Sequence, residues 1–302
     1  MKTNDFARFH GRLTIDGTLE LVTPLRIGAG GNDDMGTADI TVVKDALGYP
    51  YIPGSSFKGV FRSQVESLLR TIDEELACLC VSYADYVDDP AGSQPHCPTT
   101  LRNEALKARV QFLRGQDANP STEDGRYLDQ IHLEETCRVC RVFGSTGLAA
   151  KVLIPDLKLE PDELSDEKQW YGAYQVRHGV SIERDTETAA DGRLYTTEVV
   201  PAGTRFHCEV IVENGSDADQ GLVLLGLRAF EKKLVTLGGG SSRGLGQVQL
   251  TITDCQEIPN SGAGLIDFLV NGASHPVDET ARLGKITTLR TELREKWGVQ
   301  DA

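Results

Sequence analysis

The chain has 302 residues, 39% of them hydrophobic, which suffices for a sizeable core in one large domain or two smaller ones. It contains no run of about 18 apolar residues, and its first residues lack the apolar segment of a signal peptide, so we expect a cytoplasmic protein without a membrane partner. The net charge of −14 argues against nonspecific binding to nucleic acid. Lysines and arginines nevertheless gather in a few motifs. A protein that is acidic elsewhere can therefore still bind one RNA on a basic face.

The N-terminal part predicts a strand, a glycine-rich loop, a short strand and a helix. Apolar residues alternate over residues 10–22, glycines crowd residues 24–34, and residues 40–44 are mostly β-branched. An apolar stripe at helical spacing then predicts a helix over residues 54–77.

The start of this helix is a candidate phosphate site. Ser55 is a plausible N-cap, Ser56 follows it, and Lys58 and Arg62 share the polar face with Ser55. Helix N–H groups beside a lysine and an arginine suit an anion. A solvated helix face would also carry lysine and arginine, but the serines favour the phosphate site.

Five of the seven cysteines fall in residues 78–140, which read as an insertion with a helical stretch and a polar loop. The Cys137-x-x-Cys140 pair is one half of a zinc site, because thiolates at this spacing converge on one ion. The other half would come from Cys97 and from Cys78 or Cys80, with His96 as a possible replacement. A redox pair and simple buried thiols are the alternatives, but a metal would stabilise an insertion that has little core of its own.

Residues 175–201 predict a long exposed hairpin with arms 176–183 and 194–200 and a polar tip at 185–192. A further strand is expected over residues 205–213, followed by a helix over 219–237 whose core face includes Leu234.

The run from Leu237 to Val248 joins this helix to a strand at 247–253 and holds five glycines, two serines and one arginine. Such a backbone approaches a ligand closely, and its N–H groups, hydroxyls and guanidinium suit an RNA phosphate backbone. The candidate residues are Gly239, Gly240, Ser241, Ser242 and Arg243. A flexible turn is the alternative.

The order of elements fits an α+β fold, a ferredoxin-like antiparallel sheet with helices on one face. Its core would comprise residues 1–77 and 141–261, interrupted by the zinc-stapled insertion 78–140 and followed by a polar tail at 262–302 that forms one or two peripheral helices.

Together, these motifs resemble the RAMP superfamily of CRISPR-associated proteins, and most closely the seven-type backbone subunit of type III effector complexes. The segments that carry the resemblance follow the family's order along the chain: Leu25–Gly30, Ala38–Asp45, Ile52–Gly59, Cys137–Ser145 and Gly238–Gly246.

The resemblance implies a catalytic role for Asp39, because an aspartate at this place before the Val-x-Lys-Asp run is needed for target RNA cleavage in catalytic members. The carboxylate would position a divalent cation, magnesium or manganese, or accept a proton while the ribose 2′-OH attacks the adjacent phosphate. Asp33 and Asp34 are nearby substitutes, and a turn or cap residue is the alternative. Several relatives carry a histidine where this chain has Arg26.

The resemblance also assigns residues 175–201 to the family's thumb, which crosses the guide–target duplex at six-nucleotide intervals. Val180 and Ile182 would then wedge against bases, while Arg177 and Arg184 hold phosphates. Family members also carry zinc in the insertion, which supports the set Cys78, Cys97, Cys137 and Cys140.

The sequence thus predicts a backbone subunit that binds CRISPR guide RNA, contacts neighbouring RAMP subunits and the large and small subunits, and cuts complementary target RNA. A non-catalytic RNA-binding subunit is the first alternative. A repeat-processing endoribonuclease, using His10, His178 or His207, ranks lower, and an unrelated zinc hydrolase ranks last because no HExxH motif occurs.

Overall fold

The computed structural model describes Phe6 and residues 8–28, 38–73, 76–78, 136–145, 148–164, 174–259 and 261–297. Most of the expected insertion therefore lies outside the described residues. So do Asp33, Asp34, Cys80, His96 and Cys97. No helix in the described ranges is long and apolar enough to cross a bilayer.

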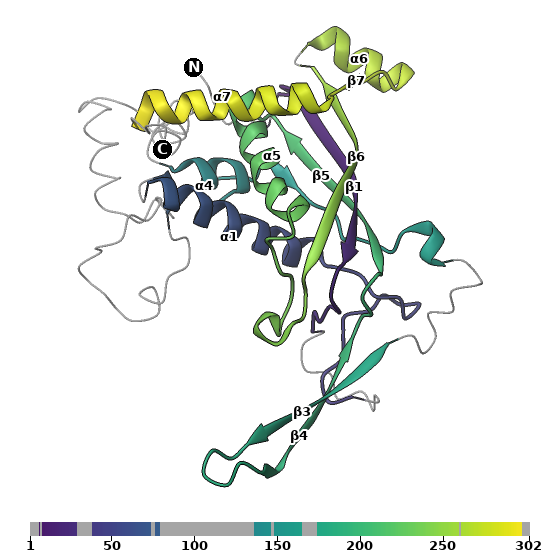
Figure 1. The fold of residues 1–302 in the computed structure, drawn as a ribbon. Helices are drawn as coiled ribbons and strands as arrows, with labels where there is room; N and C mark the ends of the chain where they lie inside the picture. Colours follow the sequence, from purple (N-terminus) through teal and green to yellow (C-terminus); the bar gives the residue numbers. More distant parts are fainter. Residues whose placement is uncertain are drawn as a thin grey trace, which may run out of the picture.

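A five-stranded antiparallel sheet forms the centre of the molecule (Figure 1). Its strand order is β2 (Val152–Leu153), β5 (Arg205–Glu213), β1 (Arg12–Leu21), β6 (Val248–Ile258) and β7 (His275–Pro276). Buried and partly exposed residues alternate along β1, as the sequence predicts for a strand with one covered face. The fold is therefore α+β.

The helices α1 (Gly54–Ile72), α4 (Arg138–Phe143) and α5 (Asp217–Glu231) lie on one side of this sheet (Figure 1). Phenylalanine rings join them, since Phe57 stacks on Phe230 at 4.8 Å between ring centroids and Phe61 meets Phe143 edge-on at 5.1 Å. Aromatic pairs in these geometries stabilise a core beyond the area that they bury.

The C-terminal residues form two helices, and the second is less peripheral than expected. Helix α7 (Glu279–Trp297) packs on α5 and buries Leu289 and Leu293. Close packing needs Gly221, where an added Cβ would lie 2.2 Å from the carbonyl oxygen of Lys285. Between β6 and β7 lies α6 (Gly262–Asn271), an apolar helix with no buried residue that projects from the body (Figure 1).

The expected hairpin is present as a separate two-stranded sheet, β3 (Gln175–Ile182) and β4 (Ala189–Val199), which extends away from the body (Figure 1). Its turn occupies residues 183–188, which is shorter than the expected tip at 185–192. Residues 189–192 of the expected tip belong to β4 instead, and Ala189 pairs with Ile182. Two short 3₁₀ helices, at Pro161–Leu164 and Ser241–Arg243, complete the described elements.

Both long helices are shorter than expected. Helix α1 ends at Ile72, and α5 ends at Glu231, so Leu234 is 71% exposed rather than part of the core. Lys233 takes a left-handed conformation (φ 60°), and the N–H of Leu234 donates to the carbonyl of Ala229, which closes the end of α5. This is a Schellman-type end with lysine where glycine is usual, so the sequence carries no obvious stop signal.

Candidate nucleic-acid interface and metal site

The root of the hairpin is where the sequence motifs meet. Leu25 and Val200 exchange backbone hydrogen bonds of 2.9 and 2.8 Å, and Ile40 forms a parallel bridge with Thr197. A third bridge joins Gly28 to Val42. Two loops near the N-terminus and the inner end of β4, which are distant in sequence, therefore form one continuous surface.

Asp39 lies exposed on this surface and is held by Thr196 of β4. The N–H and the hydroxyl of Thr196 donate to Asp39 Oδ2 at 2.6 and 2.9 Å, and the N–H of Asp39 donates to Thr196 Oγ1 at 2.9 Å. The backbone and side-chain hydrogen bonds from Thr196 lower the pKa of Asp39. The carboxylate is therefore fully ionised near neutral pH, and its Oδ1 is the oxygen that these bonds leave for a ligand.

Glu198 fixes the segment that follows Asp39. Its buried carboxylate accepts hydrogen bonds from the N–H of Val42 at 3.0 Å and from Lys44 Nζ at 2.8 Å. Lys44 Nζ also lies 4.0 Å from the ring centroid of Tyr174, a cation–π contact. The Val-x-Lys motif thus serves to dock this segment on the hairpin.

The glycine-rich loop packs against residues 24–27. The N–H groups of Gly239 and Gly246 donate to the carbonyls of Arg26 and Pro24, each at 2.9 Å. An added Cβ on Gly238 would lie 2.1 Å from the carbonyl oxygen of Arg26, and the φ of Gly238 is +70°, so only glycine fits there. The N–H of Gly239, which was predicted to bind a phosphate, is therefore bonded within the protein.

What the loop presents outward is its tip, where Gly239, Ser241, Ser242 and Arg243 are exposed and Gly240 is partly buried. The guanidinium of Arg26 lies beside the tip, since its Cζ would be 3.9 Å from a Cβ on Gly239.

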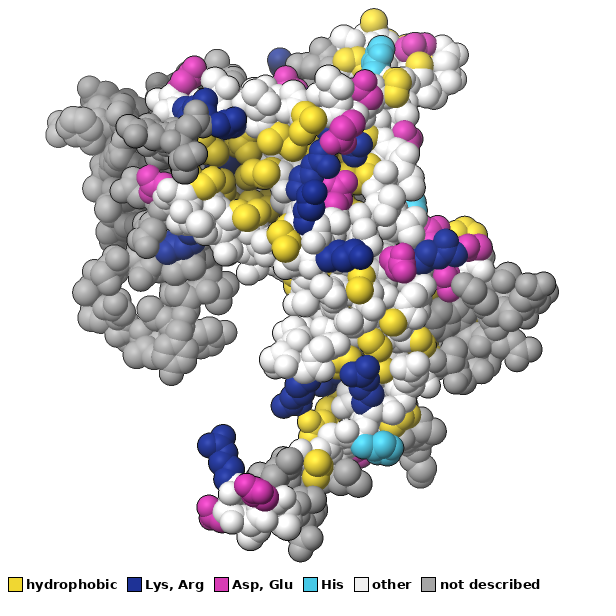
Figure 2. All heavy atoms as spheres, in the orientation of Figure 1, with side chains coloured by type: hydrophobic (Ala, Val, Ile, Leu, Met, Phe, Trp, Pro, Cys, Tyr) yellow, Lys and Arg dark blue, Asp and Glu magenta, His cyan; other side chains and the backbone are white. Residues whose placement is uncertain are grey.

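Arg243 links the loop to the hairpin. Its Nη1 donates to the hydroxyl of Tyr195 at 2.8 Å, and the Tyr195 ring covers Gly179 of β3, where an added Cβ would be 2.2 Å from the ring. Lys and Arg side chains gather where the hairpin joins the body, whereas higher on the body they lie among acidic side chains (Figure 2). The root therefore combines a guanidinium, hydroxyls and an aromatic ring on one surface.

The outer hairpin carries exposed side chains that suit a duplex. Val176 and Val180 are 39% and 44% exposed, and Arg177 and Arg184 are exposed as well. The side chain of Ile182, the other predicted wedge, lies outside the described residues. Their exposure leaves these side chains available for contact with another molecule.

The start of α1 differs from the predicted phosphate site. Its N-cap is Pro53 rather than Ser55, because both serines lie in the first turn, and the carboxylate of Asp156 accepts the N–H of Gly54 at 2.8 Å. A carboxylate thus occupies the place expected for an anion. Lys58 Nζ donates to the carbonyl of Val152 at 2.9 Å, and burial, followed by the charge of Arg62, lowers the pKa of Lys58.

The candidate histidines fall on different surfaces. His178 is exposed on β3, and the N–H of His10 donates to the side chain of Asn214. His207 Nε2 lies 3.5 Å from Asp16 Oδ1 on adjoining strands. Burial raises the pKa of Asp16, His207 opposes the rise and Asp254 adds to it. A histidine set among carboxylates is poorly placed to receive a phosphate.

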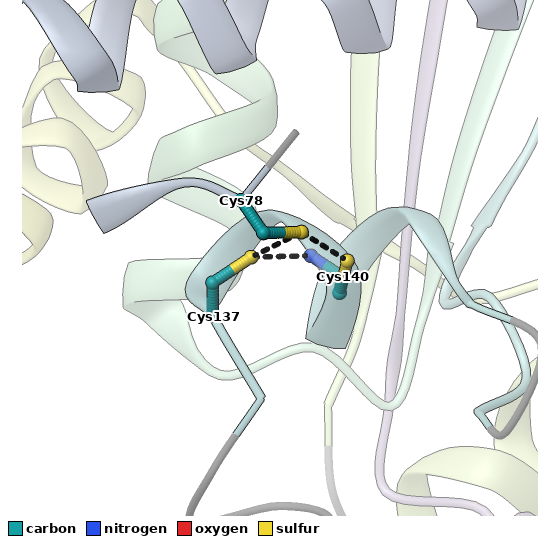
Figure 3. A group of neighbouring side chains, drawn as sticks. All are labelled: Cys78, Cys137 and Cys140. Atoms are coloured by element: carbon teal, nitrogen blue, oxygen red, sulfur yellow. Dashed lines mark hydrogen bonds between the residues drawn. The ribbon is translucent and has the colours of Figure 1, made fainter. Parts of the chain in front are cut away.

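Three cysteines from two segments converge at the start of α4, where Cys137 is the N-cap, Cys140 lies in the helix and Cys78 comes from the segment that follows α1 (Figure 3). Cys78 Sγ lies 3.4 Å from Cys140 Sγ and 3.7 Å from Cys137 Sγ. These separations exceed a disulfide bond of about 2.05 Å and approach the spacing of roughly 3.8 Å between thiolates that share a tetrahedral zinc. The cluster can hold a metal ion.

The surroundings of the cluster suit thiolates. Arg62 Nη2 donates to Cys140 Sγ at 3.1 Å, Arg62 Nη1 donates to the carbonyl of Gly144 at 2.8 Å, and Arg62 Nε donates to Glu66 at 2.7 Å. The predicted RNA contact Arg62 is therefore engaged beside the cysteines. Among the predicted ligands, Cys78, Cys137 and Cys140 come together, whereas Cys97 lies outside the described residues. Cys208 and Cys255 are buried elsewhere in the core.

Sequence reasoning missed Tyr195, Thr196 and Glu198, and it raised Arg26 only as a departure from the pattern of relatives. The three β4 residues sit in an ordinary β-forming run without glycine, cysteine or clustered charge. Their place at the root follows from pairing with segments some 150 residues earlier, as in the 157-residue separation of Asp39 and Thr196.

Comparisons with known proteins identify the family of the chain. The model of the RAMP superfamily matches residues 18–249. A protein of Methanocaldococcus jannaschii named "CRISPR system Cms endoribonuclease Csm3" is 23% identical over 297 residues, covering 95% of each chain. A protein of the same name from Methanothermobacter thermautotrophicus is 26% identical over 278 residues, covering 83% of this chain and 89% of its own. Because the family model matches most of its length, the chain belongs to the RAMP superfamily.

Proposed function

We propose that the protein is a guide-RNA-binding backbone subunit of a type III CRISPR effector complex, and that it cleaves complementary target RNA at regular six-nucleotide intervals. The two relatives named as Csm3 endoribonucleases support this role over nearly the whole chain. The single observation that carries the catalytic part is the exposed Asp39, docked on the root of a projecting hairpin. Such a complex would act in the cytoplasm and would contact other RAMP subunits and the large and small subunits.

The arrangement of the sheet supports a ferredoxin-like core. Strands β6, β1, β5 and β2 lie in this order, α1 lies between β1 and β2 along the chain, and α5 lies between β5 and β6. This is the β-α-β-β-α-β pattern of that fold. The core would present the hairpin at one end.

The RNA would run across the hairpin root. Arg243, Ser241 and Ser242 offer a guanidinium and two hydroxyls to phosphates, and Arg26 adds a second guanidinium. Guide pairing would supply sequence specificity, because these groups recognise the backbone alone. The hairpin would cross the duplex, with Val180 against bases and Arg177 and Arg184 on phosphates.

For cleavage, the 2′-OH of the target ribose attacks the adjacent phosphorus and the bond to the 5′ oxygen breaks. The products are a 2′,3′-cyclic phosphate and a 5′-hydroxyl, the 2′ proton passing to solvent and solvent protonating the leaving oxygen. The Asp39 carboxylate would hold a divalent cation, which would supply positive charge to offset the charge that develops on the phosphate. One carboxylate fits magnesium or manganese, which commonly take one or two carboxylates plus phosphate oxygens.

The cysteine cluster would hold structural zinc. Three sulfur atoms at tetrahedral spacing supply three ligands, and Cys97, Cys80 or His96 would supply the fourth. The ion would tie the two ends of the inserted segment to α4, and the guanidinium of Arg62 would offset the negative charge of the thiolates.

The test is an Asp39→Ala variant in the effector complex reconstituted with guide RNA, assayed on end-labelled complementary RNA. Loss of bands from a six-nucleotide ladder, with guide and target binding intact, is expected. Asp267→Ala, an exposed aspartate on α6, serves as the control and should cleave like the parent. An unchanged ladder for Asp39→Ala would reduce the protein to a non-catalytic RNA-binding subunit.

A further inference from the structure

Among the hairpin side chains that the structure describes, that of Thr196 holds the carboxylate of Asp39. Its hydroxyl donates to Oδ2 at 2.9 Å while it accepts the N–H of Asp39 at the same distance, and its own N–H donates to Oδ2 at 2.6 Å. A hydroxyl has one proton to donate and two lone pairs that accept, so both side-chain bonds can coexist. The pair is reciprocal, which fixes the rotamers of both residues.

Backbone hydrogen bonds on the C-terminal side of Asp39 also join its segment to β4. The N–H of Ile40 donates to the carbonyl of Thr196 at 3.2 Å, and the N–H of Glu198 donates to the carbonyl of Ile40 at 2.9 Å. Asp39 therefore moves with β4 and hence with the hairpin. A shift of the hairpin on its root would shift the carboxylate by a similar amount.

We propose that Thr196 is a positioning residue for RNA cleavage, which orients the Asp39 carboxylate and couples it to the hairpin without touching the reacting atoms. The inference rests on the proposed role of Asp39. With Oδ2 fixed, Oδ1 has one direction in which to meet the cation or the RNA. Since a displacement of about 1 Å at a reacting group costs on the order of 100-fold in rate, a carboxylate on an exposed segment needs such an anchor.

The test compares Thr196→Val with Thr196→Ser in the complex with guide RNA. Valine keeps the β-branched shape and the backbone N–H but removes both hydroxyl bonds, whereas serine retains the hydroxyl. Single-turnover cleavage by Thr196→Val should be slower by roughly 10- to 100-fold with an unchanged Kd for target RNA. Thr196→Ser should restore most of the parent rate. Thr251→Val, an exposed threonine of β6, controls for the substitution itself.

Parent-like cleavage by Thr196→Val would overturn the inference. So would equal losses in cleavage and target affinity, or a failure of serine to restore the rate, since both indicate a merely structural residue. If Thr196→Val fails to fold, Thr196→Ala takes its place. Asp39→Ala is assayed in parallel: if it cleaves normally, the proposed catalytic function fails, whereas its loss beside an active Thr196→Val rejects the positioning role alone.

Discussion

Asp219 shows how one buried carboxylate can join three elements. At the start of α5, it accepts from Lys151 Nζ at 2.8 Å and lies 3.3 Å from Arg138 Nη1 of α4. It also completes a capping box with Ser216. Burial alone would raise its pKa, but the charges of Lys151 and Arg138 outweigh burial and hold the pKa of Asp219 below its ordinary value.

Asp219→Asn should therefore lower the free energy of unfolding by about 3 kcal/mol at neutral pH, because Lys151 loses its charged partner and Arg138 keeps only Glu292 of its two. A depressed pKa stabilises the fold above the unfolded value of 3.8, and this contribution is lost as pH falls through the folded value. Denaturant unfolding of variant and parent should hence differ less at pH 3 than at pH 7. The exposed Asp267→Asn should change little at either pH, and a pH-independent gap for Asp219→Asn would contradict the assignment.

The cysteine cluster gives a second test at the scale of single residues. Cys140→Ser should reduce bound zinc, measured by elemental analysis of the purified chain, and lower the temperature of unfolding, because metal binding contributes to folding. Cys208→Ala removes a buried thiol outside the cluster and should retain the metal. Equal zinc content in Cys140→Ser and parent would reject the site.

Among the elements, the glycine-rich loop depends on two adjacent glycines in different ways. Gly238→Ala would place a Cβ 2.1 Å from the carbonyl oxygen of Arg26 at a φ of +70°, whereas Gly239→Ala meets nothing closer than 3.9 Å. We expect Gly238→Ala to cost roughly 1–3 kcal/mol of unfolding free energy and Gly239→Ala much less. Chemical denaturation of the two proteins decides this, and equal stabilities would disprove the close approach.

The hairpin should be separable from the core. Val180 lies opposite Leu194, so an Asn-Gly turn can replace residues 181–193 without changing the register of the inner strands. We expect the shortened protein to unfold at the parent's denaturant concentration, because β3 and β4 form a sheet of their own, and to lose regular target cleavage. A clear drop in stability would mean that the outer hairpin supports the core.

The elements with a regular pattern of hydrophobic residues could be predicted from the sequence. The stripe of α1 and the alternation of β1 reflect burial on one face, which a sequence displays directly. The contacts of Lys58 and Arg62 on the polar face of α1 could not be predicted, because their partners Val152 and Cys140 follow 94 and 78 residues later in the chain. The same limit applies to Thr196, whose importance depends on what pairs with β4.

At the scale of the whole molecule, charge is segregated. The net charge is −14, yet the hairpin root collects guanidiniums, while Asp16 and Asp254 lie opposite each other on β1 and β6. Repulsion from such acidic strands would keep RNA away from the sheet and direct it to the root. Specific binding in one place is thereby compatible with an acidic protein.

The position of β1 at the centre of the sheet has a consequence for synthesis on the ribosome. The first described strand pairs with β5 and β6, whose residues follow it by about 190 to 250 positions. Until those segments have been translated, both edges of β1 remain without their final partners. Contacts of such long range slow folding and expose strand edges to aggregation. The nascent chain therefore depends on late completion of its sheet, and a chaperone that covers an N-terminal strand would raise its yield.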